Sequence, residues 1–177
     1  MKKTVLIAAL FVGLIVVAVG YSDSQYRTAI GRMAPALSLV QADSLLTLQD
    51  MRGDYVLLNF WDSGDARSRE AANIYTAWVR NHHMKNLRFV SVNFDESEGL
   101  FREIVRSDSL ETSQQFHVNG DMAKAIVDNY GLKDGYGTVL IGPDGHIVAH
   151  NPTGTKLEKF LSGTKPDLHR SVRKVPS

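Results

Sequence analysis

The sequence has no cysteine among its 177 residues. This absence excludes disulfide bonds, zinc–thiolate sites, iron–sulfur clusters and every reaction that needs a thiolate. Net charge is also small, with 20 Lys and Arg against 19 Asp and Glu. A near-neutral chain lacks the basic surface that nucleic-acid binding requires, so no nucleic-acid partner is expected. Apolar residues make up 44% of the chain, which is enough for a folded domain with a core.

The N-terminus has the pattern of an export signal. Lys2 and Lys3 precede an uncharged, mostly apolar run over residues 4–22. Two interpretations stay open: residues 1–20 are a signal peptide cleaved before Tyr21, or the run is retained as a membrane anchor, since it is nearly as long as a bilayer-spanning helix. Both place the rest of the chain outside the cytoplasm, in the periplasm or cell envelope, either soluble after cleavage or tethered to the inner membrane.

The exported part is expected to hold one domain over residues 35–161, between a linker at 21–34 and a flexible basic tail at 162–177. Residues 55–61 form a nearly continuous apolar run, which indicates a strand buried on both faces. Residues 142–145 (GPDG) predict a tight hairpin turn. Strands are predicted at 36–40, 45–48, 55–61, 87–94, 115–118, 138–141 and 146–149, and helices at 66–82, 98–106, 121–130 and 156–161.

The alternation of strands and helices predicts an α/β sandwich, with helices flanking a central mixed β-sheet. Within the helices, apolar periodicity predicts the inward-facing residues, among them Ile74, Leu100 and Met122.

Several motifs in order resemble the exported thioredoxin-like oxidoreductases, the redoxin or AhpC/TSA type that includes membrane-anchored proteins of cytochrome c maturation. They are GRMAPALSL (31–39), VLLNFW (56–61), FVSVNFD (89–95) and TVLIGPDGHIV (138–148). The resemblance covers about residues 31–161 and implies a thioredoxin-like three-layer sandwich.

The resemblance implies a Cys-x-x-Cys pair at the start of the helix after Trp61, and these two positions hold Asp65 and Ser68. The family's cis-proline position holds Tyr136, for which we expect a trans bond and a reshaped loop, flanked by Gly135 and Gly137. A carboxylate or hydroxyl cannot replace a thiolate in disulfide exchange, so the family's dithiol chemistry is absent.

The residues around these positions suggest a binding groove rather than a catalytic centre. Asp65 is expected to cap the helix, and a capped, low-pKa carboxylate is a poor proton carrier. The candidate groove residues are Asp62, Ser63, Asp65, Arg67, Ser68, Arg69 and Tyr136. No catalytic residue is assigned. No metal and no cofactor are expected, because the six histidines lack metal-ligand spacing and the phosphate-binding and nucleophile motifs are missing.

Three functions follow from this pattern. The first is a redox-inactive binding or assembly module for exported proteins or peptides, and the expected partner is then an exported polypeptide, with membrane contact through residues 4–22. The second is an auxiliary component of an envelope thiol-disulfide oxidoreductase system. The third is an enzyme with a rebuilt site of Asp65, Ser68 and Arg69. The sequence does not separate the first two.

Overall fold

The computed structural model describes residues 28–41, 44–110 and 114–163. A five-stranded mixed sheet with the order β5-β4-β3-β6-β7 forms its centre. β4 pairs in parallel with β3 and β5, whereas β6 is antiparallel to β3 and β7. The strands of this sheet are β3 (Tyr55–Trp61), β4 (Leu87–Asn93), β5 (Gln115–His117), β6 (Thr138–Ile141) and β7 (Ile147–His150).

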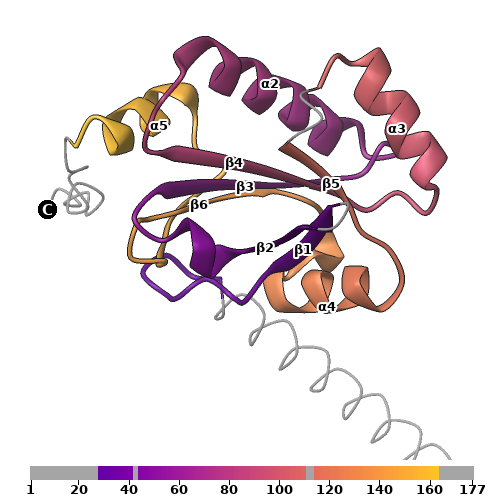
Figure 1. The fold of residues 1–177 in the computed structure, drawn as a ribbon, viewed down its shortest axis with the longest axis horizontal. Helices are drawn as coiled ribbons and strands as arrows, with labels where there is room; N and C mark the ends of the chain where they lie inside the picture. The colour runs from indigo at the N-terminus through magenta and orange to yellow at the C-terminus, as the bar shows by residue number, and fades with distance from the viewer. Residues whose placement is uncertain (1–27, 42–43, 111–113, 164–177) are drawn as a thin grey trace, which may run out of the picture.

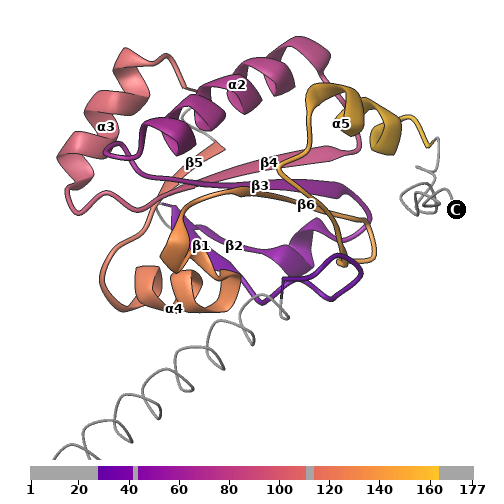
Figure 2. The same ribbon diagram turned by 180° about the vertical axis from the view of Figure 1, so that it is seen from behind.

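Helices cover both faces of the sheet, which confirms the predicted three-layer sandwich (Figures 1 and 2). One face carries α2 (Ala66–His82), α3 (Glu98–Ser107) and α5 (Gly154–Leu161). The other carries α4 (Gly120–Tyr130) together with the antiparallel hairpin of β1 (Ser38–Gln41) and β2 (Ser44–Thr47). Two short 3-10 helices, η1 (Leu48–Met51) and η3 (Leu132–Asp134), complete the described part.

β3 is buried on both faces, as its apolar sequence predicts. Side chains alternate along a strand, and accordingly Val56, Leu58 and Phe60 belong to the core cluster that includes α4, whereas Leu57 packs with the α5 cluster. All six residues from Val56 to Trp61 are buried. β3 ends at Trp61, and the turn that leads into α2 follows directly after it.

Three of the residues predicted to face inward are exposed instead. Ile74 is 58% exposed, Leu100 46% and Met122 42%. The reason for Ile74 is that α2 buries a different stripe, formed by Ser68, Ala72, Tyr75 and Thr76. An apolar residue beside the buried stripe is tolerated on a soluble surface, so periodicity alone identified the helix but not its inner face.

Residues 28–34, which lie within the expected linker, are bonded to the domain. The N–H of Gly31 donates to the Ile147 carbonyl at 2.8 Å, and the Ile147 N–H donates to the Arg32 carbonyl at 2.8 Å. Met33 forms an isolated antiparallel bridge with His146. The hydrogen-bonded part of the domain therefore begins before residue 35. The expected signal or anchor at 1–20 and most of the expected tail lie outside the described residues.

Candidate functional site

The turn between β3 and α2 carries most of the predicted site residues. Asp62 shapes it: its Oδ1 accepts from the Gly64 N–H at 2.8 Å, and its carbonyl accepts from the Asp65 N–H at 3.1 Å. These bonds reverse the chain directly after the buried strand. The first turn of α2 is therefore presented at the end of β3.

Asp65 caps α2, as predicted. Its backbone is extended (φ −97°, ψ 98°), and its Oδ1 accepts from the Ser68 N–H at 3.0 Å. The carboxylate also lies at the positive end of the helix dipole, which stabilises a negative charge. Asp65 is thus a hydrogen-bonded capping group at one of the two cysteine positions of the family.

Ser68, at the other cysteine position, is 3% exposed. Its Oγ lies 3.1 Å from the Asp65 carbonyl oxygen, to which it can donate, and it accepts from the Asp62 N–H at 3.2 Å. These are backbone groups of the same turn, and no basic side chain bonds to this hydroxyl among the described residues. Ser68 therefore holds the turn together and lacks the base that an activated nucleophile needs.

Asp95, just after β4, fixes the neighbouring part of the turn. It is 3% exposed, and its Oδ1 accepts from both the N–H and the Oγ of Ser63 at 2.8 Å. Its Oδ2 accepts from Asn93 Nδ2 at 3.1 Å. In the sequence, Asp95 is the last residue of the FVSVNFD motif and is not among the candidate groove residues. Its partner Ser63 lies 32 residues away, so no local pattern indicates this role.

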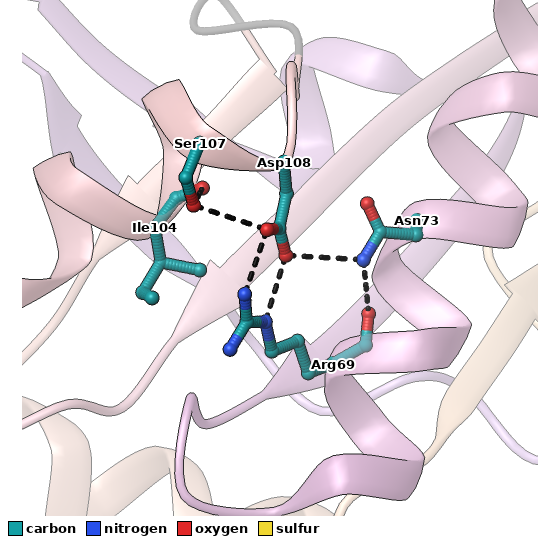
Figure 3. Close-up of polar contacts among 5 residues, drawn as sticks. All are labelled: Arg69, Asn73, Ile104, Ser107 and Asp108. Atoms are coloured by element: carbon teal, nitrogen blue, oxygen red, sulfur yellow. Dashed lines mark hydrogen bonds and ion pairs between the residues drawn. The ribbon is translucent and has the colours of Figure 1, made fainter.

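Arg69 is turned toward α3 instead of standing alone in the groove. Its Nε and Nη2 donate to the two carboxylate oxygens of Asp108, both at 2.7 Å, and Asn73 Nδ2 donates to Asp108 Oδ2 at 3.2 Å (Figure 3). The Arg69 hydrogen bonds hold the pKa of Asp108 at about 2, below its ordinary 3.8, and the Asp108 carboxylate raises the pKa of Arg69. This pair joins α2 to the C-terminal end of α3, whereas Arg67 is exposed to solvent.

Tyr136 faces the turn from the loop between η3 and β6. The described residues contain no cis peptide bond, so the bond before Tyr136 is trans, as expected. Gly135 has φ 139°, a conformation that glycine adopts and other residues rarely do, and a Cβ on Gly137 would lie 3.2 Å from Asn151 Oδ1. Both glycines therefore permit the reshaped loop.

The Tyr136 ring packs against another aromatic ring and feels the charge of three carboxylates. It stacks on Phe94, with ring centroids 5.2 Å apart and planes inclined by 22°. Burial raises the pKa of Tyr136, and the negative charges of Asp62, Asp65 and Asp95 raise it further. Tyr136 thus packs on Phe94 and lies within electrostatic reach of the Asp65 turn. A cavity of about 410 Å³ continues from Tyr136 along the loop to His150 and Asn151.

The described residues contain no cluster of three or more His, Asp or Glu side chains that could hold a metal ion. None of the helices in the described part combines the length and the apolar character that crossing a membrane requires.

Comparison with known proteins gives a consistent family. The AhpC/TSA family matches residues 30–150. A thioredoxin-like protein from Parabacteroides distasonis is 31% identical, with a TM-score of 0.64, over 76% of this chain and 96% of its own. A thiol:disulfide interchange protein from a Bacteroides species is 26% identical (TM-score 0.67, 82% and 98%).

A putative thiol:disulfide interchange protein DsbE from Chlorobium tepidum shares the fold at 20% identity (TM-score 0.61, 77% and 97%). No curated protein matches the chain.

Proposed function

Because this chain belongs to the AhpC/TSA family and carries no cysteine, we propose that it is a redox-inactive binding module for exported polypeptides. The thioredoxin-like fold is kept, while these 177 residues hold no thiol for disulfide exchange. The export pattern at residues 4–22 supports a role outside the cytoplasm, in the cell envelope. The proposed binding site is the groove between the Asp65 turn and the Tyr136 loop.

The observation that carries the proposal is the pairing of an aromatic surface with negative charge. Tyr136 stacks on Phe94, and the carboxylates of Asp62, Asp65 and Asp95 act on its hydroxyl. A cation is attracted both to the face of an aromatic ring and to carboxylates. We infer that the groove prefers an unfolded polypeptide segment that contains Lys or Arg.

Fixed geometry also supports binding in preference to catalysis. Asp65 is committed to its cap and Ser68 to the backbone of its own turn. Preformed sites bind with less loss of entropy than sites that must be ordered. The same commitments count against a rebuilt hydrolytic site, which would need a base beside Ser68.

The proposal is tested by mapping the residues to which a basic peptide binds. An unfolded Lys-containing peptide is titrated into ¹⁵N-labelled protein, and amide shifts are recorded. We expect the largest shifts at the Asp65 turn and at Gly135–Gly137, and loss of these shifts in Tyr136→Ala and Asp65→Asn. Asp121→Asn, an exposed carboxylate change on α4, is the matched control. Shifts that are spread over the surface, or unchanged in both groove variants, would refute the groove.

A further inference from the structure

A second cavity, distinct from the groove, lies between α3 and β5. Its volume is about 700 Å³, within the range of small-molecule sites. Three separate segments supply its apolar wall. Val40 comes from β1, Phe116 comes from β5, and Phe101, Val105 and Leu110 come from α3 and the residues just after it. Apolar side chains from these segments thus line one cavity at the edge of the sheet.

One face of α3 provides much of the lining. Glu98, Phe101, Arg102, Val105 and Arg106 follow the spacing i, i+3, i+4, i+7 and i+8, which places them on one side of a helix. The apolar members therefore form the wall, and the charged members stand on the same side of the helix, at its exposed margin.

The charges at the cavity are mainly positive. Arg102 and Arg106 line it with side chains 74% and 77% exposed, and Glu98 is the only acidic lining residue among those described. Arg102 pairs with Glu98, whereas Arg106 pairs with Glu103, which does not line the cavity. Exposed ion pairs of this kind contribute little, so both guanidinium groups can turn to an incoming anion.

The opposite wall is held in place before any ligand arrives. The His117 ring stacks on Phe101, with centroids 5.4 Å apart, and its Nε2 lies 2.7 Å from the Asp95 carbonyl oxygen. A carbonyl only accepts, so Nε2 carries the hydrogen and donates this bond. The aromatic part of the cavity is therefore preformed, which lowers the entropic cost of binding.

We propose that this cavity binds a small amphipathic carboxylate, with its apolar tail among Phe101, Val105 and Phe116 and its headgroup at Arg102 and Arg106. The apolar wall suits the tail, and two positive side chains against one negative suit an anion. A three-residue edge strand offers little length for strand pairing, which favours a small molecule over an extended peptide. This inference does not depend on the proposed function of the groove.

The test is calorimetric titration of the full-length protein with decanoate, below its micelle concentration, and with decylammonium as the cation of equal chain length. We expect saturable binding of decanoate and none of decylammonium. Val40→Trp should block the cavity mouth and abolish binding. Leu45→Trp is the matched control, because Leu45 pairs directly with Val40 and is 63% exposed on the hairpin against 57% for Val40, but does not line the cavity.

Charge removal tests the headgroup position. The double variant Arg102→Gln/Arg106→Gln should lose decanoate binding and keep its unfolding transition, because both side chains are exposed and their ion pairs contribute little. Three results would overturn the proposal: no saturable binding, equal binding of decanoate and decylammonium, or equal effects of Val40→Trp and Leu45→Trp. Binding of the basic peptide to the groove is measured on the same variants and should be unchanged, which separates the two sites.

Discussion

Arg69 and Asp108 face each other in a two-bonded ion pair whose N···O distances are both 2.7 Å. The pair joins the first turns of α2, where Asp65 and Ser68 lie, to the C-terminal end of α3 (Figure 3). The same α3 forms a wall of the second cavity. One ion pair therefore links the helix that begins at the proposed groove to the helix that lines the cavity.

The Arg69–Asp108 ion pair should make the free energy of unfolding depend on pH in the acidic range. The pKa of Asp108 is about 2 in the fold, below its ordinary 3.8. A carboxyl with a lowered folded pKa stabilises the protein above its ordinary pKa, and this contribution is lost as the pH falls toward 2. Asp108→Asn should lower the free energy of unfolding at neutral pH by roughly 1–2 kcal/mol. This is less than the full pKa shift would give, because the Arg69 side chain is about one-third exposed and solvent screens the pair.

Urea denaturation at a series of pH values checks this prediction. Wild type should lose stability between about pH 4 and about pH 2 more steeply than Asp108→Asn. Asp121→Asn, which changes a fully exposed carboxylate, should follow the wild-type curve. Parallel curves for wild type and Asp108→Asn would show that the ion pair contributes nothing.

The Asp65 cap should carry a measurable share of stability. Asp65→Ala removes the acceptor for the Ser68 N–H and should cost about 0.5–2 kcal/mol. Asp65→Asn should cost less, because it keeps an acceptor and loses only the charge. Asn119 is the matched control, since it precedes α4 at the same position but makes no side-chain cap bond. If Asn119→Ala proved as costly as Asp65→Ala, the cap would not explain the effect.

The electrostatics of the groove can be read directly from Tyr136. Burial and the charges of Asp62, Asp65 and Asp95 raise the pKa of its hydroxyl above the ordinary 10.0. Removing one charge with Asp62→Asn should lower that pKa, whereas Asp144→Asn, on the β6–β7 turn, should not. NMR titration of ring-labelled tyrosine gives the value. An unchanged pKa in Asp62→Asn would mean that the turn and the loop do not interact.

Neither the activity nor the stability of the protein should depend on redox conditions. These 177 residues contain no cysteine, so insulin-disulfide reduction and peroxidase turnover should stay at the buffer rate. The melting temperature should not differ between oxidising and reducing buffer by more than about 2 °C, the shift that corresponds to roughly 1 kcal/mol in a domain of this size. Thiol-dependent turnover in a pure preparation would contradict the chemistry proposed for the chain.

The sequence predicts the local features of the fold and the site, but not the contacts between residues that are far apart in the chain. Strand β3 and the Asp65 cap follow from short patterns of apolar and capping residues. Sequence proximity to Asp65 and Ser68 predicts that Arg69 lies in the groove, but its partner Asp108 is 39 residues away, at the end of another helix. Pairings of this kind depend on how elements pack, which periodicity does not specify. The same holds for the stacking of Tyr136 on Phe94 and for the hydrogen bond from Ser63 to Asp95.

The affinity of wild type and of Asp65→Asn for one unfolded basic peptide tests the central claim most directly. Fluorescence anisotropy is measured beside urea stability on the same samples, with the Lys→Glu version of the peptide as control. The account predicts that wild type binds the basic peptide and not its acidic version, and that Asp65→Asn loses more binding energy than stability. Equal affinity for the two peptides, or equal affinity of the two proteins, would contradict it.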